Sequence, residues 1–325
     1  MAKTDTRSAT DVAALLEGYG RMLLLRRFEE AMQRLFLRGD IHGTVHLYTG
    51  QEAVSVGVCA ALEPGDQVAA TYRGHGAALA KGTEPEALAA ELMGRTTGAC
   101  GGRAGSMNVI DLDHGLLGCF GIVGGSIATA TGAALTAQRE GRVVVAFFGD
   151  GAANQAYFQE CLNFAQVFGL PVLFVCENNG YGEFTPWEQV TAGGDISARA
   201  ASLGLPAGKV DGNDLQAVMM AAREAVERAR GGGGPTFIEA LTYRHLGHSK
   251  SDPGAYRPEG ELASWLERDP LVVLRARLTG ELGVEEGQLD AIEREAQERI
   301  DQAIEAALAA PYPDPEADRA TEYAP

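Results

Sequence analysis

The sequence predicts an α/β fold: a parallel sheet flanked by helices, with helical extensions at the N- and C-terminal ends. Short continuous apolar runs are typical of strands buried on both faces of such a sheet, and the two clearest runs are separated by a helical segment. Hydrophobic residues make up 46% of the chain and charged residues 22%, so a disordered protein is excluded. We expect one domain over 1–325, with its core at about 40–250 and a helical region with a tail at about 259–325.

The elements before the middle of the chain are expected to be helices, loops and one short strand. Apolar residues recur at helical spacing over 11–38, and the pair Gly39-Asp40 that follows is expected to end this helix. A glycine- and histidine-rich loop over 41–50 leads to a small-residue helix over 52–61 and a strand over 67–70. The glycine density over 94–126 indicates either a flexible linker or backbone packed against a ligand, and interleaved apolar residues favour the ligand.

The clearest unit of the chain is a strand, a helix and a second strand. Val143–Phe148 and Val172–Cys176 are the apolar runs, and 154–168 between them is helical. This order predicts two parallel strands close together in one sheet. The other expected elements are helices over 127–138 and 215–230, a strand over 236–241, and an amphipathic helix with Leu289, Ile292, Ala296, Ile300, Ile304 and Leu308 on one face.

The chain is strongly acidic. It has 44 Asp and Glu against 27 Lys and Arg, a formal net charge of −17, and 18 acidic but only 7 basic residues lie in 251–325. Such a surface repels phosphate backbones, so we expect no nucleic-acid partner. No apolar stretch reaches the roughly 18 residues of a membrane span, and the N-terminus has no targeting pattern. We therefore expect that the protein does not associate with a membrane and is cytoplasmic. The five cysteines form no CxxC pair and are interpreted as reduced.

Polar residues follow both strands of the clearest unit. GDG at 149–151 follows the first strand and ENNGY at 177–181 follows the second, with 29 residues from Asp150 to Asn179. Ligands of open parallel sheets bind outside the carboxyl ends of the strands, so these side chains can converge on one point. GDGAAN also resembles the GxGxxG pattern of dinucleotide sites. A carboxylate about 4 Å from a phosphate costs on the order of 4 kcal/mol at an effective dielectric of 20, which counts against a dinucleotide alone.

A divalent cation between the carboxylate and a phosphate reverses this repulsion. Asp carboxylate, Asn amide oxygen and a backbone carbonyl are the oxygen ligands that Mg²⁺ takes, with phosphate oxygens and water completing the set. The N–H groups at the start of the helix after Gly151 would meet the same phosphates. The pattern therefore predicts a Mg²⁺–diphosphate site.

At these residues the chain resembles a known family. GDGAANQ…CENNGYG is similar to the metal and diphosphate motif of thiamine diphosphate (ThDP) enzymes, more specifically of α subunits of the E1 component of 2-oxo acid dehydrogenases such as pyruvate dehydrogenase, and of acetoin dehydrogenase. The resemblance covers nearly the whole chain through VHLYTGQEAVSVG, TYRGHG, GRAGSM, GIVGG, TYRHLGHSKSDP and PYPDP. It implies the ThDP-binding fold, with this chain as the diphosphate-binding domain.

The resemblance assigns roles to residues that match the family's motifs. The implied Mg²⁺ ligands are Asp150, Asn179 and the carbonyl of Tyr181. The implied cofactor-binding residues are Tyr72, Arg73, Gly121, Val123, Asp150, Gly151, Ala152, Asn179, Arg244 and His248. His248 would also donate protons, for which an unperturbed pKa near 6.5 is suited, and His46 would line the substrate side. Ser249 and Ser251 match positions phosphorylated in some eukaryotic relatives. Departures from the family pattern are Arg103, Ala104, Asn108, Phe120 and Glu183.

The resemblance also implies partners. In this family a second, pyrimidine-binding domain supplies the activating Glu, and 325 residues leave no room for it here. We therefore expect an E1 β subunit in an α2β2 heterotetramer, cleavage of the C–C bond next to a carbonyl of a 2-oxo acid, and transfer of the acyl group to the lipoyl domain of an E2 acyltransferase. Three alternatives stay open: an acetoin dehydrogenase α subunit, towards which GTVHLYTGQEAV and FFGDGAANQ lean, a stand-alone ThDP lyase or transferase of special metabolism, and a non-catalytic ThDP-binding partner.

Overall fold

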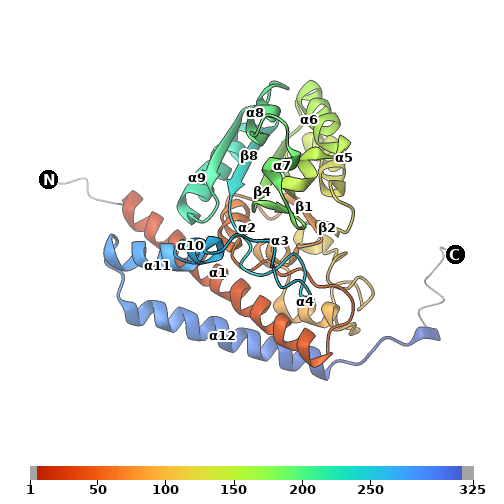
Figure 1. The fold of residues 1–325 in the computed structure, drawn as a ribbon, viewed down its shortest axis with the longest axis vertical. Coiled ribbons are helices and arrows are strands. Elements are labelled where there is room, and N and C mark those ends of the chain that lie inside the picture. Colours follow the sequence, from red (N-terminus) through yellow and green to blue (C-terminus); the bar gives the residue numbers. More distant parts are fainter. Residues whose placement is uncertain (1–5, 317–325) are drawn as a thin grey trace.

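A six-stranded, fully parallel sheet forms the centre of the protein, whose computed structural model describes residues 6–316 (Figure 1). The strand order across the sheet is β2 (Leu116–Phe120), β1 (Gln67–Thr71), β3 (Val144–Gly149), β4 (Val172–Asn178), β8 (Thr236–Leu241) and β7 (Ala207–Asp211). The α/β fold class and the four predicted strands are confirmed, and the two strands of the clearest unit are direct neighbours. The sequence did not predict β2, which lies inside the glycine-rich segment, or β7, an edge strand (AGKVD) with no apolar run.

The sheet is buried on both faces, with successive side chains pointing to opposite sides. In β3, Val145 and Phe147 belong to one apolar cluster, and Ala146 and Phe148 belong to the other. All four are 1% exposed or less. This explains why the buried strands read as continuous apolar runs rather than as alternating ones.

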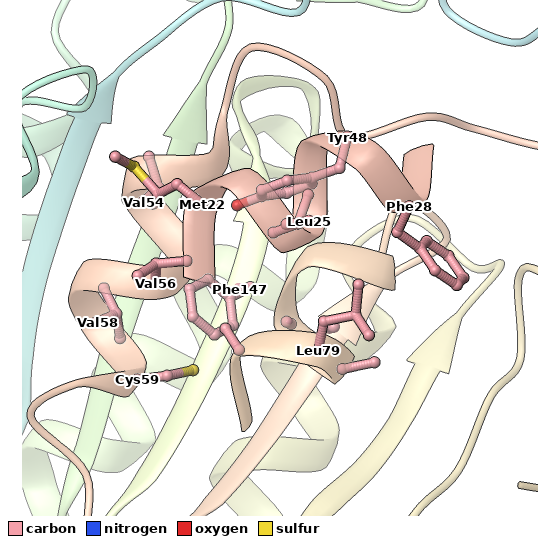
Figure 2. Packing of buried hydrophobic residues seen from close by; sticks show 14 of the residues in the cluster. Met22, Leu25, Phe28, Tyr48, Val54, Val56, Val58, Cys59, Leu79 and Phe147 are labelled. Carbon is pink, nitrogen blue, oxygen red and sulfur yellow. The ribbon is translucent and has the colours of Figure 1, made fainter. Parts of the chain in front are cut away.

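One face of the sheet is covered by the N-terminal helices and by α9. Figure 2 shows Met22, Leu25 and Phe28 packed with Tyr48 and Phe147 in this cluster. The helices are α1 (Thr6–Arg38), α2 (Glu52–Cys59), α3 (His75–Lys81), α4 (Pro85–Leu92) and α9 (Leu215–Arg230). The predicted helix over 11–38 is therefore confirmed, with an earlier start.

The other face is covered by α5 and α6, with α8 beside them. Their bounds are Gly125–Glu140 (α5), Ala156–Phe168 (α6) and Ile196–Ala201 (α8). Short elements fill the connections: η1 (Leu112–His114), η2 (Asp150–Asn154), β5 (Tyr181–Gly182), β6 (Thr185–Pro186) and α7 (Trp187–Val190). The strands β5 and β6 pair as a small antiparallel hairpin immediately after β4.

The C-terminal helices pack on the N-terminal ones. They are α10 (Glu261–Leu266), α11 (Pro270–Gly280) and α12 (Glu286–Ala309). The predicted amphipathic face is confirmed, since Leu289 and Ile300 are fully buried. Figure 1 shows α12 lying along α1, and it also contacts α4. Among the described residues, no helix is long and apolar enough to cross a membrane.

The strand order reverses between β1 and β3. From β1 the chain passes to β2 on one side, whereas β3 lies on the other side and leads on to β4. A crevice outside the carboxyl ends of the strands is expected at such a switch point, and ligands of α/β sheets bind there. Thr71 and Gly149 end the two strands, so the Tyr-Arg pair and the GDG turn emerge side by side at this crevice.

Candidate active site

A cavity of about 530 Å³ opens at this switch point. Every residue predicted for the site lines it except Arg244, which lies beside it and donates to the carbonyl of Glu183 in the wall. The predicted residues in the wall are His46, Tyr72, Arg73, Gly121, Val123, Asp150, Gly151, Ala152, Asn179, Tyr181 and His248. The topology therefore brings together residues from six separate stretches of the chain.

Asp150 follows β3 directly and is 1% exposed. Burial raises the pKa of its carboxyl to about 6, against the lowering effects of backbone N–H groups and of the Arg244 charge. Its Oδ2 atom is buried and, within residues 6–316, has no hydrogen-bond partner. Because an unpaired buried carboxylate oxygen is costly, a bound cation would satisfy it.

The backbone after Asp150 differs from the expected one. Residues Asp150–Asn154 form a 3₁₀ turn, and the α-helix begins only at Ala156. Gly151 and Ala152, which line the cavity, therefore belong to this turn and not to the first turn of an α-helix. Gly151 also approaches Gly182 closely enough that an added Cβ would touch its Cα at 3.4 Å.

Asn179 follows β4 and is held on both ends of its amide. Its Nδ2 donates to Oε1 of Gln51 at 2.8 Å, and its Oδ1 accepts from the backbone N–H of Tyr181 at 3.4 Å. The phenol of Tyr181 donates to Glu261 at 2.6 Å, so a metal contact from this residue would come from its backbone. Carboxylate, amide and carbonyl oxygens fit a hard cation such as Mg²⁺. The part of the chain that the structure describes holds no cluster of three or more His, Cys, Asp or Glu side chains arranged for a metal.

Two buried arginines lie beside these groups. Arg73 donates through Nη1 to the carbonyl of Leu47 at 2.6 Å and through Nη2 to the carbonyl of His248 at 2.8 Å. Burial lowers the pKa of its guanidinium to about 10, so it stays cationic at neutral pH. Arg244 is 1% exposed, and its Nη1 has no partner in the described chain. Its other terminal nitrogen holds Glu183, a non-glycine residue with φ of +57°.

His46, Tyr72 and His248 form one aromatic cluster at the cavity. The ring centroids lie 4.5 Å (His46–Tyr72), 5.0 Å (His46–His248) and 5.7 Å (Tyr72–His248) apart. Burial, followed by the nearby charge of Arg73, lowers the pKa of His46 to about 3 and that of His248 to about 4. The expectation of an unperturbed His248 is therefore wrong for this state: both rings are neutral at pH 7.

The loop that carries His248 is tied down at several points. The His248 N–H donates to Asp252 Oδ2 at 2.5 Å, and Arg73 holds the His248 carbonyl. Arg257 donates to three successive backbone carbonyls of this loop, those of Arg244, His245 and Leu246. The hydroxyl oxygens of Ser249 and Ser251 lie 3.2 Å apart on its exposed side.

Sequence reasoning missed three buried polar residues, two in the cavity wall and one outside it. Glu177 lines the cavity and accepts a hydrogen bond from the Tyr48 hydroxyl, and burial raises the pKa of the Glu177 carboxyl to about 7. Gln51 lines the cavity and holds Asn179. The sequence carries a signal for both residues, because Glu177 lies in CENNGYG and Gln51 lies in VHLYTGQEAVSVG, two motifs of the family resemblance.

Glu91 is the third missed residue, and it explains half of the glycine-rich segment. Its fully buried carboxylate accepts four backbone N–H groups, from Cys100 (2.7 Å), Gly102 (2.9 Å), Ala104 (2.7 Å) and Gly105 (3.1 Å). The segment over 98–105 is thus wrapped around an internal anion. The expected proximity to a ligand applies farther along, where Met107 and the residues Phe120–Gly124 line the cavity.

His75 fixes the end of this wrapped segment. Its Nε2 lies 2.8 Å from Ser106 Oγ, and its Nδ1 lies 3.0 Å from the carboxylate of Glu29. This Ser-His-Glu chain is buried throughout and lies outside the cavity lining, and its Glu29 carboxylate also accepts from the backbone N–H of Tyr48, so it ties separate segments of the chain together.

The fold and the site define a class: an α/β protein with a cavity lined by buried polar groups at the switch point of a parallel sheet. Residues 20–316 match the family described as dehydrogenase E1 component. The α subunit of acetoin:2,6-dichlorophenolindophenol oxidoreductase from Bacillus subtilis (strain 168) is 46% identical over 316 residues, which cover 96% of this chain and 94% of that protein. Its counterpart from Cupriavidus necator is 44% identical over 94% of this chain and 93% of that protein. Pyruvate dehydrogenase E1 component subunit alpha of Rhizobium meliloti (strain 1021) is 43% identical over 92% of this chain and 87% of that protein. The chain therefore belongs to the dehydrogenase E1 component family and is an E1 α-type oxidoreductase subunit.

Proposed function

We propose that the cavity binds thiamine diphosphate together with Mg²⁺. The observation that carries this proposal is the set of buried polar atoms without partners among residues 6–316. Asp150 Oδ2 requires a cation, whereas Arg244 Nη1 and Gln51 Nε2 require an acceptor. A diphosphate with a divalent cation supplies both, because its oxygens accept from the donors and its metal meets the carboxylate. Asp150, Asn179 and the Tyr181 carbonyl would hold the metal.

The other residues of the site would hold the organic part and exchange protons. Arg73 and Arg244 are the cations that face the diphosphate, with Tyr72 beside them, and the backbone of Gly151 and Ala152 completes this end. Gly121 and Val123 form the wall assigned to the aminopyrimidine ring. Thiamine diphosphate, when bound, supplies the carbon nucleophile and the electron sink for cleavage next to a carbonyl. Burial is the main cause of the lowered pKa of His248, and an anion beside Arg73 would offset the second cause, the Arg73 charge, and so raise this pKa part of the way towards the range for proton donation.

A β subunit is the proposed partner, in an α2β2 assembly. The site is open, with Ile122 70% exposed and Val123 41% exposed at its rim. The two helices that begin beside the cavity, α5 and α6, also present large apolar side chains to the outside: Leu135, Tyr157, Phe164, Val167 and Phe168. Such an outward apolar face favours a protein partner that also closes the cavity. A single domain over the whole chain and a cytoplasmic location remain predictions.

The proposed reaction is cleavage of the bond next to the carbonyl of a 2-oxo acid such as pyruvate, with transfer of the acyl group to E2 lipoamide. Acetoin is the second candidate substrate. It is favoured by the two relatives at 46% and 44% identity, which are named acetoin oxidoreductase subunits, against 43% for a pyruvate dehydrogenase subunit.

The chain is to be co-expressed with its β subunit and assayed with pyruvate and with acetoin in the presence of a lipoylated E2 domain. Release of CO₂ from pyruvate supports the first substrate, and lipoamide-dependent acetoin cleavage without CO₂ supports the second. ThDP binding is measured separately by calorimetry in Mg²⁺. Absence of binding to the purified pair, or binding by Asp150→Ala equal to that of the unaltered chain, refutes the proposal.

A further inference from the structure

Gln51 stands at a fixed point of the cavity wall. Its backbone N–H donates to the carbonyl of Tyr48 at 3.1 Å, and its own carbonyl accepts from Val54 at 3.0 Å in the first turn of α2. The residue is fully buried and lines the cavity between the His46 loop and the end of β4. Its side chain is therefore held in one place before any ligand arrives.

The hydrogen bond from Asn179 Nδ2 to Gln51 Oε1 decides which end of the Asn179 amide is free. An Asn ligates a cation through Oδ1, whereas its NH₂ group repels one. The two ends have nearly the same size, so packing alone does not select between them. With Nδ2 held by Gln51 at 2.8 Å, the oxygen end is turned away from Gln51. The other bond to this amide, from the Tyr181 N–H to Oδ1, is longer at 3.4 Å.

The second end of the Gln51 amide carries a separate signal. Its Nε2 is buried and unpartnered in the chain as described, although the side chain reaches the cavity. A buried amide donor without an acceptor is costly, so a ligand oxygen would satisfy it. Gln51 thus offers an acceptor to Asn179 and a donor to the cavity.

We propose that Gln51 is a positioning residue for the cation site: through Oε1 it orients Asn179 with the amide oxygen toward the metal, and through Nε2 it donates to an oxygen of the bound diphosphate. This inference rests on the proposed function. The family resemblance gives no role to Gln51, which lies in the GQEA stretch shortly after His46.

The test uses Mn²⁺ as the probe, because its free aqueous ion gives an EPR signal that is lost on binding. The full chain, co-expressed with its β subunit, is titrated with Mn²⁺ at saturating thiamine diphosphate. Gln51→Leu removes the acceptor and the donor, and its Mn²⁺ affinity should fall by about 10- to 100-fold, as for other groups that orient metal ligands. Gln51→Glu keeps an acceptor for Asn179 but replaces the donor by a negative charge. Its Mn²⁺ affinity should be no weaker than that of the unaltered chain, while its thiamine diphosphate affinity falls.

The control is Gln297→Leu, the same chemical change on α12, where the Gln297 side chain donates within the helix to Asp301 at 2.8 Å, far from the cavity residues. It should leave Mn²⁺ affinity unchanged. The inference is overturned, and the proposed function is left intact, if the Mn²⁺ affinity of Gln51→Leu lies within threefold of that of the unaltered chain. It is overturned in the same way if Gln51→Glu binds Mn²⁺ as weakly as Gln51→Leu does. No Mn²⁺ binding by the unaltered complex overturns both. If Gln51→Leu fails to fold, as judged by its thermal unfolding, Gln51→Met replaces it in the same comparison.

Discussion

Replacing Glu91 by glutamine should lower the free energy of unfolding by about 3 kcal/mol. Each carboxylate oxygen of Glu91 accepts two backbone N–H groups, and a hydrogen bond to a charged acceptor contributes roughly 1.5–3 kcal/mol. Glutamine keeps one oxygen but turns an NH₂ donor toward the other two N–H groups, so two bonds are lost. Taking the lower value for each gives the estimate of about 3 kcal/mol.

The measurement is urea unfolding of the full chain, with hydrogen exchange of the amides over 98–105 as the local readout. Glu84→Gln is the matched control at the start of the same helix. Its carboxylate is 63% exposed and pairs with Arg299 at 2.9 Å, so its loss should cost less than about 1 kcal/mol. If both variants unfold at the same urea concentration and the 98–105 amides stay protected in Glu91→Gln, the account of the wrapped segment is refuted.

Further outcomes are expected at other positions. Since burial lowers the pKa of His46 to about 3, the stability that depends on its neutral form is complete above pH 6.5 and is lost as the pH falls from 6.5 toward 3. Between pH 7 and pH 5, His46→Gln should therefore lose about 2 kcal/mol less unfolding free energy than the unaltered chain, and equal losses would contradict the shift. Arg73→Lys replaces two separate donor nitrogens by a single one, which cannot reproduce the fork that reaches both carbonyls. Thiamine diphosphate binding should therefore weaken at least about 10-fold, with faster proteolysis near His248, and unchanged affinity in calorimetry would speak against this bridge. Gly98→Ala would place a Cβ 2.4 Å from the Glu91 carboxylate and should cost more than about 2 kcal/mol. Gly101→Ala, in open space at φ of +68°, should cost only about 1 kcal/mol by urea unfolding, and a reversed order would refute the packing argument.

The strongly apolar parts of the fold could be predicted from the sequence. Val143–Phe148 and Val172–Cys176 are buried on both faces of the sheet, which explains why their sequences are continuous apolar runs. The edge strand β7 could not be found in this way, because one of its sides is free and its residues AGKVD carry no such run. The strand β2 was hidden by the glycine-rich segment in which it lies, and only residues 98–105 of that segment are wrapped around the buried Glu91 carboxylate.

The site was predictable where a motif carries a chemical role and not where a residue acts through another. Asp150 and Asn179 follow adjacent strands, so topology alone brings them to one cavity. Gln51 is far from Asn179 in the sequence, and only the packed structure shows their hydrogen bond. The lowered pKa of His248 depends on Arg73 and on burial, neither of which spacing reveals.

The position of α12 has a consequence for how the chain is made. Arg27 in the first helix pairs with Glu293 in the last, and Arg299 joins α12 to Glu84 near the start of α4. Contacts so far apart in sequence require a large loop to close before they contribute anything. A nascent chain emerging from the ribosome therefore holds part of the apolar surface of α1 uncovered until residues 286–309 have been synthesised. Packing of α1 is thus completed late, when the last helix joins it.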